Sequence, residues 1–103
     1  MGKRFQVIVD SMLEPVMDRY FEIRYEELEQ MEQALVAGDA ETIALLGHRL
    51  KGSGTSYGFV RLTELGAIIE AAGRDAELEQ AREPLAEVRS YLDAVDVVFG
   101  EQG

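Results

Sequence analysis

The chain's one histidine, His48, lies in the segment GHRLKGSGTSYGF, which spans residues 47–59. Lys51 follows it by three positions and Gly52 by four, and on a helix both positions lie on the same face as the histidine. A neutral imidazole has a free lone pair at neutral pH, so it can accept a phosphoryl group and release it again. A nearby ammonium and a neighbour without a side chain would suit that reaction. The segment therefore indicates phosphoryl carriage.

The charges around His48 support this interpretation. The chain has 20 acidic and 10 basic side chains and a formal net charge of −10, yet no Asp or Glu occurs between Glu41 and Glu64. Because a phosphoryl group adds negative charge, a local cation and the absence of nearby carboxylates would stabilise it. We therefore expect Lys51 to stabilise the phosphoryl group, with no carboxylate near the ring.

The helical periodicity also predicts where His48 points. At about 100° per residue, five residues share one arc and form the expected buried face: Ile43, Leu46, Gly47, Leu50 and Gly54. His48 lies about 140° from the centre of that arc, so its ring should face solvent. Each neighbouring feature, taken alone, has a simpler explanation: Gly54 can mark a helix end, and Lys51 can be one more solvated charge.

The length and composition of the chain exclude several classes. Its 103 residues suit one domain, residues 1–103, with a core of its own. The absence of cysteine excludes disulfides and thiolate metal sites and favours a reducing compartment, so we expect a cytoplasmic protein. The apolar runs are too short to span a membrane, and we expect no signal segment. The negative charge disfavours nucleic acid and anionic lipid as partners.

Apolar residues recur at steps of three and four along most of the chain, the spacing of amphipathic helices. Four helices are expected, at about residues 11–37, 40–55, 59–73 and 84–99. Asp10 or Ser11 can cap the first helix, Gly38 can end it, and Asp39 can cap the second. Short turns between amphipathic helices indicate an all-α fold, an antiparallel four-helix bundle over about residues 11–99.

The two ends of the chain differ from this pattern. Residues 3–9, KRFQVIV, are rich in β-branched and apolar types, but such a run alone has no strand partner. We therefore expect residues 1–10 to form an extended arm lying on the bundle. Pro84 conflicts with one unbroken last helix because an interior proline costs about 3 kcal/mol. A kink or a restart is expected there, with the main helix running to Phe99 and residues 100–103 frayed.

The motif around the histidine resembles that of a known family. Its residues are His48-Arg49-Leu50-Lys51-Gly52-Ser53, followed by Gly58, Leu62, Leu65 and Glu70. This resembles the histidine-containing phosphotransfer (HPt) domain of two-component phosphorelays, whose pattern is H-x-L-K-G-S with a downstream glycine, leucines and L-E. The resemblance covers about residues 13–99. It implies a four-helix bundle whose histidine takes a phosphoryl group from one receiver-domain aspartate and passes it to another.

The resemblance assigns roles to residues of this chain. His48 would be the phosphoryl acceptor, Lys51 would stabilise the phosphoryl group, and Gly52 would give the receiver access. The sequence departs from the family pattern at Gly54, where many members have alanine or serine, and at Ile69-Glu70, which replaces leucine-glutamate. Neither departure is expected to touch the acceptor.

The resemblance also implies partners and excludes others. The expected partners are a response-regulator receiver domain and the receiver of a hybrid sensor histidine kinase. From the charge and the short apolar runs we expect no nucleic acid and no membrane, and we expect a monomer with no second copy. The residues expected to dock the partner share the face of His48: Ala44, Leu45, Arg49, Gly52 and Thr55. No cofactor is expected on this chain, because the receiver brings Mg²⁺. The chain would be a phosphocarrier and not an enzyme.

Rival interpretations come from other classes. A P-loop needs a lysine after its second spaced glycine and a strand before it, whereas here Lys51 precedes Gly52. A carboxylate-bridged metal bundle needs a Glu three residues before its His, and that position is Leu45. The alternative that stays open is a helical interaction module, which docks and titrates a receiver or kinase without accepting phosphate.

Overall fold

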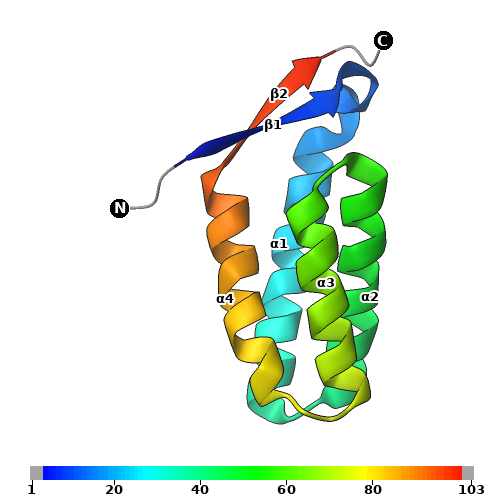
Figure 1. Cartoon of the computed structure of the whole chain (residues 1–103), viewed down its shortest axis with the longest axis vertical. Helices are drawn as coiled ribbons and strands as arrows, with labels where there is room; N and C mark the ends of the chain where they lie inside the picture. The colour runs from blue at the N-terminus through cyan, green and yellow to red at the C-terminus, as the bar shows by residue number, and fades with distance from the viewer. Residues whose placement is uncertain (1–3, 101–103) are drawn as a thin grey trace.

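The computed structural model describes residues 4–100, and this part of the chain is mostly helical. Its elements are, in order, β1 (Phe5–Asp10), the short 3-10 helix η1 (Ser11–Leu13), α1 (Glu14–Ala37), α2 (Ala40–Tyr57), α3 (Val60–Arg74), α4 (Glu79–Ala94) and β2 (Val95–Gly100). The four helices lie alongside one another, and the two strands cross one end of them (Figure 1). The first three residues of the expected arm and the last three of the expected frayed end lie outside the described residues.

Local signals account for the helix boundaries around the site. Gly38 ends α1 in the left-handed conformation, at φ 73°, which costs glycine no steric strain. The Asp39 side chain then caps α2 by accepting the backbone N–H of Thr42 at 3.1 Å. Gly58, at φ 85°, ends α2 in the same way. The caps at Gly38 and Asp39 are as predicted.

In residues 4–100, no helix combines the length and the apolar character needed to cross a bilayer.

The start of the helical region differs slightly from the expectation. Asp10 acts as a cap, but it caps η1, where its carboxylate accepts the N–H of Met12 at 2.9 Å. The α-helix begins only at Glu14, and Pro15 occupies its first turn, where a missing N–H costs nothing.

The four helices are present as expected, but the expectation of an N-terminal arm without a strand partner is wrong. Phe5–Asp10 is a strand that pairs in parallel with Val95–Gly100, from Phe5 opposite Val95 to Asp10 opposite Gly100. The sequence analysis missed this sheet because its two strands lie about ninety residues apart and because Val95 and Phe99 also fit a helical spacing. The protein is therefore mostly helical, with a small parallel sheet that joins its two ends.

The expected last helix is also corrected at both ends. α4 begins at Glu79, before Pro84, and runs through the proline without a break. Pro84 removes one hydrogen bond near the start of the helix, and five buried side chains hold α4 on the core: Ala81, Leu85, Val88, Tyr91 and Leu92. The helix ends at Ala94, and the residues up to Phe99 form β2.

The core lies between the helices and continues under the sheet. Its largest fully buried side chains are Phe59, Leu28, Met31, Ile43, Leu50, Leu62, Leu65, Ile69, Val9 and Val88. Aromatic rings fill the end nearest the strands, where Phe5 packs on Tyr91 at 4.8 Å between ring centroids and Tyr91 meets Phe59 edge-on at 6.2 Å. Val9 is 1 % exposed, so β1 closes the core and is part of the fold.

Candidate functional site

His48 lies on the outer side of α2, as the periodicity predicts. Its side chain is 62 % exposed. The five residues expected on the inner face are all buried: Ile43, Leu46, Gly47, Leu50 and Gly54. The imidazole is therefore open to a partner or to solvent, although one edge of the ring faces the neighbouring helix α3.

A buried carboxylate on α3 meets that edge of the ring. Glu70 is 4 % exposed, and its Oε2 lies 2.9 Å from His48 Nδ1. Its Oε1 accepts a hydrogen bond of 2.8 Å from Lys51 Nζ, and Arg74 Nη2 lies 2.9 Å from Oε2. One carboxylate thus joins the histidine to two cations, one from each helix.

This contact corrects two expectations from the sequence. No carboxylate was expected near His48, and the Ile69-Glu70 pair was not expected to touch it. The stretch without acids is real along α2, but α3 packs directly against α2 and supplies Glu70 from across the interface. Distance along the chain was therefore a poor guide to distance in space.

The protonation of the cluster follows from these contacts. Hydrogen bonds from Lys51 and His48, together with the charge of Arg74, hold the pKa of the Glu70 carboxyl below its usual range, although burial acts in the opposite direction. An ionised carboxylate can only accept hydrogen bonds, so the neutral ring must carry its proton on Nδ1. The lone pair of His48 is then on Nε2, the nitrogen that does not face Glu70.

Two glycines allow Glu70 to reach the histidine. A Cβ built on Gly47 would lie 2.5 Å from the backbone nitrogen of Glu70, and a Cβ built on Gly66 would overlap the backbone nitrogen of Lys51. The backbones of α2 and α3 therefore touch at this level. Any side chain at either glycine would force the helices apart and would move the carboxylate away from the ring.

A second ionic cluster lies on the α1 side of His48. Glu27 of α1 is 8 % exposed; its Oε1 lies 3.0 Å from Arg24 Nη2 and its Oε2 lies 3.6 Å from Arg49 Nη1. Like Glu70, Glu27 is one buried carboxylate with two cations. Arg49, the residue that follows His48, is thus tied to a buried carboxylate of α1.

The residues expected to dock a partner all lie on α2, but their environments differ. Leu45 is 51 % exposed, and a Cβ on Gly52 would meet no atom within 4 Å. Thr55 is exposed and donates from Oγ1 to the backbone oxygen of Lys51 at 3.0 Å. Ala44 is half-buried, and Arg49 is exposed but tied to Glu27. The open space predicted at Gly52 is present.

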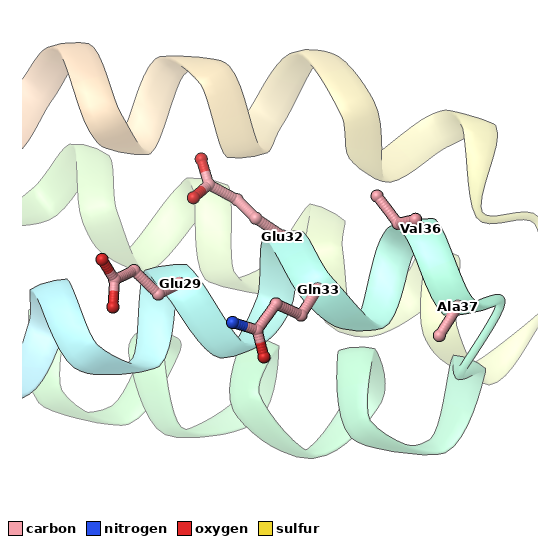
Figure 2. A pocket seen from close by; sticks show the side chains of 5 residues that line it. All are labelled: Glu29, Glu32, Gln33, Val36 and Ala37. Atoms are coloured by element: carbon pink, nitrogen blue, oxygen red, sulfur yellow. The ribbon is translucent and has the colours of Figure 1, made fainter.

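A shallow hollow elsewhere on the surface carries no comparable chemistry. It lies along the second half of α1 and is lined by Glu29, Glu32, Gln33, Val36 and Ala37 (Figure 2). Of its two carboxylates, that of Glu32 accepts hydrogen bonds from Arg89 of α4 at 2.8 and 3.2 Å. None of its lining residues is a histidine, and we therefore place the candidate site at His48.

Three features of the site were not predicted from the sequence: the contact of Glu70 with His48, and the participation of Arg74 and of Glu27. One signal could have found the first two: α3 has an apolar inner face with small residues at Gly66 and Gly73, and Glu70 sits between them with Arg74 one turn further on. A carboxylate on such a face needs a cation. For Glu27 we find no comparable signal, because α1 contains many acids.

An exposed nucleophilic nitrogen on a helix, with its other nitrogen held by a buried carboxylate, is a site suited to carrying a group between partners. A comparison with protein-family models matches residues 16–97 to the Hpt domain. The chain belongs to the Hpt domain family, whose members are phosphocarrier modules of phosphorelays in two-component signalling and not classical enzymes. Searches of curated proteins and of solved structures found no match.

The close approach of α2 and α3 can be tested by substitution. We expect Gly66→Ala to lower the free energy of unfolding by about 1–3 kcal/mol, because the added methyl group meets rigid backbone. Gly52→Ala is the matched control: it is also a helical glycine, but in open space, and it should raise the free energy of unfolding by about 0.5–1 kcal/mol. Urea denaturation measures both. Equal stability of Gly66→Ala and the wild type would contradict the backbone contact.

The hydrogen bond from His48 to Glu70 predicts one tautomer of the ring. Long-range ¹H–¹⁵N NMR spectra of the wild type should show the proton of the neutral ring on Nδ1. Glu70→Ala removes the acceptor that holds the proton on Nδ1, so signals of both tautomers are expected. Glu64→Ala, which removes an exposed acid from the same helix, should leave the wild-type pattern. A protonated Nε2 in the neutral wild-type ring would show that Glu70 does not orient it.

Proposed function

We propose that this chain is a histidine phosphotransfer protein in which His48 accepts a phosphoryl group from the aspartyl phosphate of one receiver domain and passes it to another. One partner would be a response-regulator receiver and the other the receiver of a hybrid sensor histidine kinase. The observation that carries the proposal is the pairing of an exposed ring with a buried Glu70 at 2.9 Å from Nδ1.

The chemistry follows from this arrangement. The lone pair of His48 Nε2 forms a bond to phosphorus while the bond from phosphorus to the aspartyl oxygen breaks, and the aspartate leaves as a carboxylate with the bonding electrons. The ring, which keeps its proton on Nδ1, gains positive charge. The ionised Glu70 faces that proton and stabilises the charge, much as a buried aspartate stabilises the imidazolium of a catalytic triad.

Lys51 has a role that depends on Glu70. Its ammonium lies 2.8 Å from Glu70 Oε1 and is part-exposed, one turn along the helix from the ring. A phosphoryl group on Nε2 would bring negative charge to the same face, and Lys51 can turn toward it while Arg74 continues to neutralise Glu70. The excess of cations over carboxylates in the cluster supports this role.

The partner would supply what this chain does not. We propose that the receiver brings Mg²⁺ and places its aspartyl phosphate in line with Nε2, so that catalysis depends on positioning. The docking surface would consist of Ala44, Leu45, Arg49, Gly52 and Thr55, all on α2. We propose that the neighbouring helices of this bundle run antiparallel. Gly52 leaves room beside the ring for the loops of the receiver.

A transfer assay with a phosphorylated receiver domain tests the proposal. The wild type should take the label, and His48→Gln should take none, while its stability should change little, because the glutamine amide can still donate to Glu70. Glu41→Gln, an exposed change at the start of α2 and outside the docking surface, should be labelled like the wild type.

Other outcomes of the same assay have definite meanings. A wild type that binds the receiver but takes no label would replace the proposal by the interaction module that titrates its partner. Label on His48→Gln would show that the acceptor is another residue.

A further inference from the structure

Glu70 contacts more cations than its single charge requires. Its Oε1 accepts the hydrogen bond from Lys51 Nζ at 2.8 Å, and its Oε2 lies 2.9 Å both from His48 Nδ1 and from Arg74 Nη2. The Glu70 side chain is 5 % exposed, so water does little to balance its charge, and a cation of the protein must do so. One of the two cations would be enough for that purpose.

Lys51 is the cation that a phosphoryl group would draw away. Its side chain is part-exposed, and in this structure its ammonium is held by Glu70. A phosphoryl group on Nε2 of His48 would have more negative charge than the carboxylate and three acceptor oxygens. If Lys51 turned toward it, a buried carboxylate would lose a partner, which is costly when no other cation remains. The availability of Lys51 therefore depends on what stays beside Glu70.

Arg74 is placed to stay there. It lies on α3 one turn after Glu70 and contacts Oε2, whereas Lys51 contacts Oε1. The departure of Lys51 would therefore leave the contact of Arg74 intact. The guanidinium keeps its charge at any ordinary pH. That charge also lowers the pKa of the Glu70 carboxyl, in the same direction as the hydrogen bond from Lys51, which is the larger cause.

We propose that Arg74 is a positioning residue of the site, which keeps Glu70 neutralised when Lys51 turns to the phosphoryl group and so makes Lys51 available for the reaction. The inference rests on the proposed transfer to His48. Of the two cations that contact Glu70 in residues 4–100, only Lys51 would remain without Arg74. The carboxylate and the phosphoryl group would then compete for one ammonium.

Arg74 also has a simpler possible role. It lies in the last turn of α3, where a positive charge interacts favourably with the C-terminal end of the helix. That interaction would stabilise the helix whether or not residue 70 is charged. The positioning role, in contrast, acts only through the carboxylate of Glu70, and this difference can be measured.

Labelling by phosphoramidate tests the positioning role without a docking partner. In this reaction the bond from phosphorus to nitrogen of the donor breaks as Nε2 bonds to phosphorus, and ammonia leaves. We expect Arg74→Gln to lower the rate constant of labelling roughly tenfold, the effect of losing one charged hydrogen bond at a part-exposed site. Before labelling, its ring should still carry the proton on Nδ1, because Lys51 continues to neutralise Glu70. Arg74→Lys keeps a cation one turn from Glu70 and should restore most of the rate.

Two comparisons show whether the effect runs through Glu70. Arg82→Gln is the matched control for net charge, because Arg82 is an exposed arginine of α4 in an ion pair with Glu79 of the same helix. It should be labelled like the wild type. In Glu70→Gln, Lys51 has no carboxylate to neutralise, so the further change Arg74→Gln should leave the rate constant of that variant unchanged.

Several results would overturn the inference and leave the proposed function intact. One is equal labelling of Arg74→Gln and the wild type, and another is an equal fold-loss from Arg74→Gln in the wild-type and Glu70→Gln backgrounds. A third is an Arg74→Gln protein whose ring has lost the Nδ1 proton before labelling, which would show a structural role. A wild type that takes no label from phosphoramidate or from a phosphorylated receiver would instead overturn the proposed function, and the inference with it.

Discussion

The carboxylate of Glu70 can reach His48 because α2 and α3 touch through their backbones. At Gly47 and at Gly66 there is no room for even a methyl group. This close contact places α3 so that a buried side chain from it comes up beside the exposed face of α2. The orientation of the ring, the position of Lys51 and the local balance of charge all follow from it.

The same contact bears on the proposed function, in which a strongly acidic protein would carry a phosphoryl group. Glu70 is buried, so its charge must be balanced within the protein, and Lys51 and Arg74 do so. Glu27 has a similar pair of arginines on the other side of α2. Glu70 thus holds two cations next to the histidine, and Glu27 holds Arg49, the residue that follows His48. A phosphate added to Nε2 would lie near a cluster that has two cations, Lys51 and Arg74, and one carboxylate.

The local features of the fold could be predicted from the sequence, and the non-local ones could not. The exposure of His48 and the caps at Gly38 and Asp39 depend on residues within one or two turns, which periodicity and capping rules describe. The parallel sheet depends on two segments at opposite ends of the chain, and Val95 to Phe99 fits a helical spacing as well as an alternating one.

The site also combines local features that could be predicted with a non-local contact that could not. The helical periodicity predicted an exposed histidine with a lysine one turn away, and both are in place. The contact with Glu70 could not be derived from spacing, because it depends on how closely two helices pack. Glycines on the inner faces of both helices were visible in the sequence, but their meaning as a backbone contact required the structure.

In the proposed mechanism, Glu70 holds the proton on Nδ1 of His48 and so makes Nε2 the nitrogen that reacts. The most direct measurement is an NMR spectrum of ¹⁵N-labelled protein phosphorylated by a small phosphodonor, in which coupling to ³¹P identifies the modified nitrogen. We expect coupling to Nε2 of His48, with Nδ1 still protonated and hydrogen-bonded to Glu70. Phosphate on Nδ1, or on a residue other than His48, would contradict it.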